Sequence, residues 1–79
     1  MSPTVFYKNN IRFFFFSLEE DRMHIHVSQA GKKAKFWIEP SIELDNSYGF
    51  NLKELKLIEQ EIINNESAIR EKWNSHHNS

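Results

Sequence analysis

The stretch that decides the fold runs from Met23 to Ile38 and reads Met-His-Ile-His-Val-Ser-Gln-Ala-Gly-Lys-Lys-Ala-Lys-Phe-Trp-Ile. We interpret it as a β-hairpin with a two-residue turn at Ala30–Gly31, because glycine readily adopts the positive φ that such turns need. This turn sets the register of the two strands and places Gln29 opposite Lys32. Every pair further from the turn follows from that one.

Because side chains alternate across a strand, the register divides the hairpin into two faces. It places His26 opposite Lys35, and His24 opposite Trp37. The first face is apolar and is expected to belong to the core: Met23, Ile25, Val27, Ala34, Phe36 and Ile38. The second face is cationic, aromatic and rich in imidazole, and it is the candidate functional face: His24, His26, Ser28, Lys33, Lys35 and Trp37.

Two segments that precede this hairpin are also predicted to be strands. Residues 4–8 and 11–17 are rich in β-branched and aromatic residues, which favour strands. Asparagine tolerates left-handed backbone, so Asn9–Asn10 is expected to join them in a tight turn. A two-residue turn there would set Val5 opposite Phe14.

The last third of the chain is predicted to be one long helix over residues 51–76. Its apolar side chains recur every three or four residues, and we expect them to pack on the core face of the hairpin: Leu55, Ile58, Ile62, Ile69 and Trp73. Asn51 and Glu54 have the spacing of a capping box. Asn64–Asn65 are weak helix formers and are expected to mark either a bend or local fraying. Residues 75–79 are expected to form a disordered tail.

These elements predict an α+β fold in which an antiparallel meander of three to four strands packs against one long C-terminal helix. Residues 1–79 form a single domain, with its strands within 4–45 and its helix at about 51–76. Residues 41–45 fit either a short edge strand or an extended connector, and residues 46–49 are expected to form a turn or loop.

Four consecutive phenylalanines, Phe13 to Phe16, occupy both faces of one predicted strand. A strand that is apolar on both faces is normally covered on both sides, and one helix covers only one of them. Either the second face binds another chain, a second copy or a ligand, or Phe14, Phe16 and Trp37 form a small cluster shielded by the chain ends.

Composition narrows the class of protein. The chain has 79 residues, no cysteine and a net charge of −1, with 10 basic against 11 acidic residues. The absence of cysteine excludes disulfides and thiolate zinc sites and favours a reducing compartment. No signal peptide and no run long enough to cross a bilayer is visible, so we expect a cytoplasmic protein without a membrane partner. The near-neutral charge means that any nucleic-acid site is a local patch.

The order and spacing of several short motifs resemble the bacterial domain-of-unknown-function 4160 family. These motifs are Pro3-Thr4-Val5, Phe13-Phe14-Phe15, His24-Ile25-His26-Val27, Ala34-Lys35-Phe36-Trp37, Pro40, Gly49-Phe50 and Trp73-Asn74. One departure is Met23, which stands where relatives often have proline. The resemblance implies no established enzymatic activity. It implies a genomic setting, since such proteins are commonly encoded beside another small protein in pairs proposed to be toxin–antitoxin modules, with this domain as the toxin.

Three interpretations of the second face remain open. In the first, the face docks a protein, either the cognate small protein encoded next to it or a second copy. Aromatic side chains and arginine are the types enriched at interface hot spots, and this interpretation ranks first. The side chains expected to bind are Arg12, Phe14, Phe16, Lys33 and Trp37.

In the second interpretation the protein is an RNA-cleaving toxin. Histidine titrates near neutrality, so His24 and His26 would serve as general acid and base while Lys35 stabilises a phosphate. In the third, the same face binds nucleic acid without catalysis. A metal site is the weakest alternative, because two imidazoles lack a fixed third ligand and only the acidic loop at 19–21 offers one. We therefore predict no metal and no cofactor.

Overall fold

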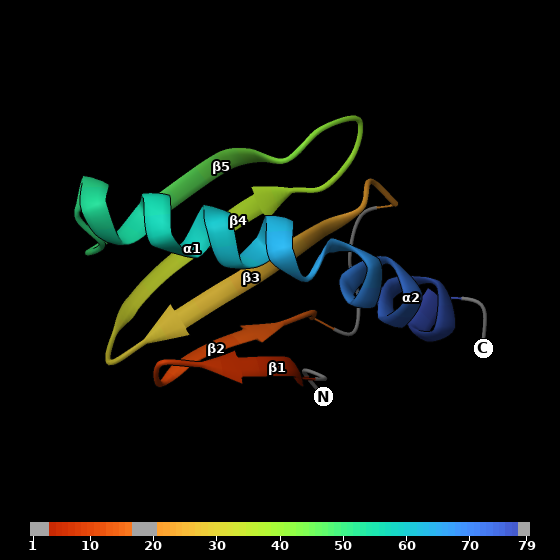
Figure 1. The fold of residues 1–79 in the computed structure, drawn as a ribbon, viewed down its shortest axis with the longest axis horizontal. Coiled ribbons are helices and arrows are strands. Elements are labelled where there is room, and N and C mark those ends of the chain that lie inside the picture. Colours follow the sequence, from red (N-terminus) through yellow and green to blue (C-terminus); the bar gives the residue numbers. More distant parts are fainter. Residues whose placement is uncertain (1–3, 17–20, 78–79) are drawn as a thin grey trace.

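The structure of the protein is a computed structural model, and it describes residues 4–16 and 21–77. Five strands form one antiparallel sheet in the order β1-β2-β3-β4-β5, followed by two helices (Figure 1). Their bounds are β1 Thr4–Lys8, β2 Ile11–Phe14, β3 His24–Gln29, β4 Lys32–Trp37, β5 Glu43–Tyr48, α1 Leu52–Asn64 and α2 Glu66–His77. The α+β class is confirmed, with one strand and one helix more than the sequence predicted.

The central hairpin has the predicted register along its whole length. Gln29 lies opposite Lys32, and the pairing continues outward until His24 lies opposite Trp37. Ala30 and Gly31 both have positive φ, at 46° and 85°. This turn geometry matches the right-handed twist of the flanking strands, which is why two residues suffice to connect them.

The first hairpin also turns on two residues of positive φ, Asn9 and Asn10. Its register differs from the prediction at one point, because Thr4 rather than Val5 lies opposite Phe14. The reason is an irregularity between Thr4 and Phe6, where the strand holds one extra residue. β2 also ends at Phe14, earlier than predicted. Ser17, which the prediction included in this strand, lies outside the described residues.

The fifth strand corrects the interpretation of residues 46–49 as a turn. β5 runs from Glu43 to Tyr48 and pairs with β4 as an edge strand. All six of its residues are exposed, so hydrophobic alternation carried little signal for it. Asn46 lies opposite Lys35 and Leu44 lies opposite Phe36, which leaves Asp45 as the extra residue of a bulge.

The helical segment is divided at Asn65, where the sequence predicted a bend. The Asn65 backbone amide bonds to the carbonyls of Glu61 and Ile62, and its side-chain amide donates to the Glu61 carbonyl at 2.8 Å. A side chain that competes for helix carbonyls in this way ends the first helix. The capping box at Asn51 and Glu54 is present. α2 continues to His77, so residues 75–77 are helical rather than a disordered tail. Residues 78–79 lie outside the described chain.

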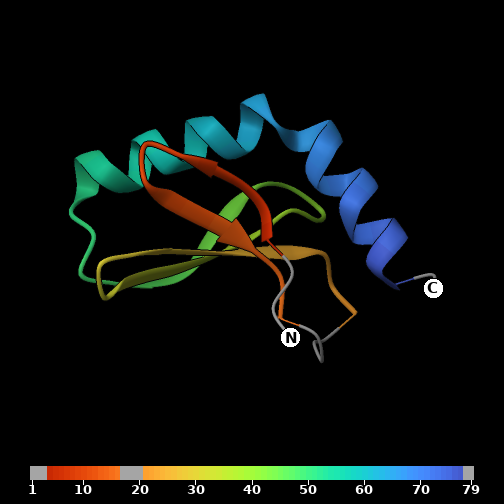
Figure 2. The same ribbon diagram turned by 90° about the horizontal axis from the view of Figure 1, so that it is seen from below.

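The core lies between one face of the sheet and the helices. Figure 2 shows α1 running along that face, while α2 turns down past the end of the strands. The predicted contacts are confirmed, because the helix and hairpin residues belong to one cluster in which Leu55 is partly buried: Ile25, Val27, Phe36, Ile38, Ile58, Ile62, Ile69 and Trp73. Within the described ranges, neither helix has the length and apolar character that a membrane span requires.

Candidate functional site

The face of the sheet that lies opposite α1 is the candidate site, and we call it the open face. Cross-strand pairing arranges its side chains in two rows that run across all five strands. The first row is Tyr7, Arg12, Ser28, Lys33 and Tyr48. The second row is Thr4, Phe14, His26, Lys35 and Asn46. The rows therefore carry three cationic and three aromatic side chains, and none of their ten residues is acidic.

His24 occupies a different environment from the one expected. Its imidazole is fully buried, and its ring centroid lies 5.0 Å from that of Trp73 and 5.6 Å from that of Trp37. Nδ1 lies 2.6 Å from the carbonyl oxygen of Arg22. A carbonyl only accepts hydrogen bonds, so Nδ1 carries the proton and donates. The expectation that both histidines lie on an accessible surface is therefore wrong for His24, because α2 covers the end of β3.

His26 remains on the open face and is held among aromatic rings. Its ring centroid lies 4.3 Å from that of Phe16, 5.6 Å from that of Phe14 and 5.1 Å from that of His24. The two imidazoles are therefore neighbours, as strand alternation predicts. They differ in solvent exposure, because His26 is half-buried whereas His24 is fully buried.

Trp37 lies between two cations at one end of the open face. The guanidinium carbon of Arg22 is 3.9 Å from the Trp37 ring centroid, and the Lys35 ammonium is 4.3 Å from it. Lys35 also lies 3.7 Å from a carboxylate oxygen of Asp45. The bulge in β5 thus supplies a carboxylate at the edge of a cationic surface, and it lowers the net positive charge there.

Phe14 shows how the phenylalanine run is accommodated. It is buried although the helices lie on the other face, because Arg12 stacks over it at 4.3 Å and Phe16 packs edge-on at 5.3 Å. Arg12 is itself held by a 2.8 Å hydrogen bond from its Nε to the Thr4 hydroxyl. Phe13 and Phe15 lie in the core, so Phe16 is the member of the run that is exposed, at 44%.

The structure adds four residues to the site that sequence reasoning did not select. Tyr7 and Tyr48 are 67% and 73% exposed and end the first row. Asn46 ends the second row, and Arg22 stacks over Trp37. The Asn9–Asn10 turn already implied that Tyr7 lies beside Arg12. No comparable signal existed for Tyr48, because its strand was read as a turn.

Metal binding finds no support in the described residues. Across residues 4–16 and 21–77, histidine and carboxylate side chains do not gather in a group of three that could hold an ion. Two of the acidic residues proposed as a third ligand, Glu19 and Glu20, lie outside the described chain.

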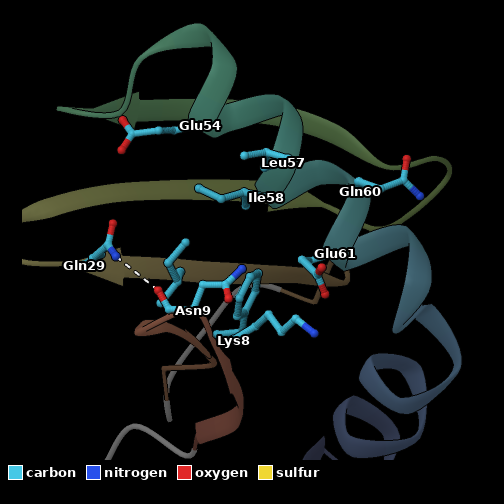
Figure 3. A pocket seen from close by; sticks show the side chains of 10 residues that line it. Lys8, Asn9, Gln29, Glu54, Leu57, Ile58, Gln60 and Glu61 are labelled. Atoms are coloured by element: carbon cyan, nitrogen blue, oxygen red, sulfur yellow. Dashed lines mark hydrogen bonds between the residues drawn. The ribbon is translucent and has the colours of Figure 1, made fainter.

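A hollow of about 260 Å³ lies on the helix side of the sheet, between α1 and the turn of the first hairpin (Figure 3). Leu57 and Ile58 project into it from α1, and Gln29 donates a 3.3 Å hydrogen bond to the Asn9 carbonyl at its border. Glu54 lines the same hollow. None of the residues predicted for the site lies here, so the candidate chemistry is confined to the open face.

Comparison with known proteins places this arrangement in a family. The family model described as Domain of unknown function (DUF4160) matches residues 10–74. No significant match was found among curated proteins or among solved structures. The matched region runs from the end of the first turn into α2, so it includes His24, His26, the rest of the central hairpin and Trp73. This chain belongs to the DUF4160 family.

Proposed function

We propose that this protein is the toxin component of a toxin–antitoxin-like pair and that it docks its cognate small protein through the open face. The observation that carries the proposal is the exposure of Tyr7, Phe16 and Tyr48 on the face that the helices leave uncovered. Tyrosine and arginine are enriched among the side chains that dominate interface energies. The pairing with a neighbour-encoded protein rests on the family resemblance.

The open face has the dimensions of a protein interface. Its rows cross four strand spacings, which corresponds to about 19 Å. A standard interface buries about 800 Å² on each partner, which is a modest part of the 5111 Å² that this chain exposes.

RNA cleavage by His24 and His26 is less well supported by the geometry. A general acid or base must come within hydrogen-bond reach of the proton that it transfers. The His24 ring is fully buried, with Trp73 and Trp37 beside it, so a substrate on the open face cannot contact both imidazoles. Lys35 remains close to His26, opposite it in the register.

The experiment measures binding between the purified chain and the protein encoded by the adjacent reading frame, with the chain alone tested for self-association. Tyr48→Ser is expected to weaken either association by about 2 kcal/mol, or roughly thirtyfold, as at an interface hot spot. Leu57→Ser is the matched control, because Leu57 is 61% exposed on α1, away from the face. Equal affinities for Tyr48→Ser, Leu57→Ser and the natural chain would rule out this face as the interface.

A further inference from the structure

A pocket of about 250 Å³ lies within the open face, between the end of β2 and the edge strand β5. It is distinct from the hollow beside α1, since the two share no lining residue. Its walls combine aromatic rings, two lysines, a hydroxyl and an amide. The side chains that line it are Phe14, Phe16, His26, Ser28, Lys33, Lys35 and Asn46, with Val27 and Ala34 at its base.

One wall of the pocket is a cluster of flat rings. His26 is stacked near Phe14 at an interplanar angle of 29° and meets Phe16 at 62°. Phe16 presents an exposed part of its ring to the pocket mouth. Nucleobases stack on such aromatic side chains whatever their sequence, because every base has a π-face.

The pocket also provides charge and hydrogen-bonding groups. Lys33 and Lys35 both line it, and Lys33 is exposed at the rim. Ser28 and Asn46 add a hydroxyl and an amide, which can donate to and accept from the polar edge of a base. A pocket lined both by aromatic rings and by lysine side chains is complementary to a nucleobase joined to a phosphate.

We infer that this pocket receives one nucleotide of a single-stranded nucleic acid, with its base against Phe16 and His26 and its phosphate beside Lys33. The neighbouring nucleotides then follow the first row, where Arg12 contacts the backbone and Tyr7 and Tyr48 offer further stacking surfaces. This inference goes beyond the proposed function, because it assigns the face a ligand of its own that requires no partner protein.

The test measures the affinity of the full chain for a fluorescein-labelled hexauridine RNA by fluorescence anisotropy at low salt. Phe16→Ser should weaken binding by about five- to 150-fold, the range for losing one stacked base. Lys33→Ser should weaken binding and lower the salt dependence, since each phosphate contact contributes about 0.7 to the slope of log affinity against log salt. Lys53→Ser is the matched control, because Lys53 is an exposed lysine on α1.

Further probes test whether the pocket binds RNA, any single strand, or only a simple anion. A hexadeoxyuridine DNA that binds as well as the RNA shows a general single-strand site, and tighter binding of the RNA shows that its 2′-hydroxyl groups contribute. Uridine monophosphate should shift the NMR signals of Val27, Ala34 and Asn46 at higher concentration, whereas inorganic phosphate alone should not. Identical shifts with inorganic phosphate would show an anion site and overturn the nucleotide assignment.

The inference fails if double-stranded RNA binds as tightly as the single strand, or if Lys53→Ser weakens binding as much as Lys33→Ser. Each result would mean that binding follows overall charge rather than the pocket. Folding of every variant is checked by its thermal unfolding curve. Because these measurements use the chain without any partner protein, a failure here leaves the protein-docking proposal intact, and loss of partner binding leaves the nucleotide site intact.

Discussion

The indole ring of Trp73 lies 5.0 Å from the imidazole ring of His24, centroid to centroid, at an interplanar angle of 68°. Trp73 comes from the last helix and His24 from the first residue of β3. The same indole also meets Phe15 edge-on at 5.3 Å. Through these contacts α2 closes the end of the sheet, and it separates one histidine of the pair from solvent while the other stays on the open face.

The hydrogen bond from His24 to the Arg22 carbonyl leads to a prediction about its tautomer. We expect neutral His24 to carry its proton on Nδ1, because the carbonyl 2.6 Å away can only accept. Long-range nitrogen-proton NMR spectra at alkaline pH distinguish the two ring nitrogens, and His24→Gln assigns the signal by removing it. A neutral His24 ring protonated on Nε2 would contradict the hydrogen bond.

Neighbouring isoleucines in α1 test how the helix packs. Ile62 is fully buried in the core, and Ile63 is 46% exposed. We expect Ile62→Ala to lower the free energy of unfolding by about 2–5 kcal/mol, because it removes packed methyl groups and leaves a cavity. Ile63→Ala should change it by no more than about 0.5 kcal/mol, as surface substitutions do. Urea unfolding measures both, and similar losses for the two variants would mean that the helix is rotated relative to the sheet.

The interactions of the Glu54 carboxylate predict that the free energy of unfolding depends on pH. A hydrogen bond from the Lys32 ammonium at 2.8 Å is the main cause that lowers the pKa of Glu54 from its ordinary 4.5, and the Asn51 backbone amide adds to it. Because the pKa is lower in the folded state, this stabilisation is present above pH 4.5 and is lost as the pH falls below that value.

We therefore expect the difference in unfolding free energy between the natural chain and Glu54→Gln to be constant near neutral pH and to shrink under acid conditions. Glutamine retains an oxygen that can accept from the Asn51 amide, so the cap is largely kept. Lys32→Met should shrink the same pH dependence by removing the main partner. Urea unfolding from pH 7 to pH 3 provides the measurement, and a difference that stays constant over this range would disprove the assignment.

Two glycines with nearly equal φ should differ in their tolerance of a side chain. Gly31 has φ +85° and Gly49 has φ +89°, and alanine in this left-handed region costs roughly 1–2 kcal/mol. A Cβ atom at Gly31 would meet nothing within 4 Å, whereas one at Gly49 would lie 3.0 Å from Lys32 Cγ and 3.4 Å from Lys32 Cα. Gly49→Ala should therefore destabilise the protein more than Gly31→Ala in thermal unfolding, and the reverse order would contradict this packing.

The sequence by itself determined the features that depend on residues close together along the chain. The turn at Ala30–Gly31 and the two-residue repeat of a strand are local, so the register from Gln29 opposite Lys32 outward to His24 opposite Trp37 was predictable. The capping box at Asn51 is local too, because a side chain and a backbone amide three residues apart complete it.

Only the tertiary structure decided which of these side chains a ligand can contact. Strand β5 is exposed and joins the sheet through backbone pairing to β4, so its side chains show little hydrophobic alternation. This pairing places Tyr48 and Asn46 on the open face. His24 alternates with the core residues and reads as a surface residue. It is buried because the helical segment is interrupted at Asn65, so that Trp73 of α2 packs against it. Strand periodicity does not encode this contact, because the two residues lie far apart in the sequence.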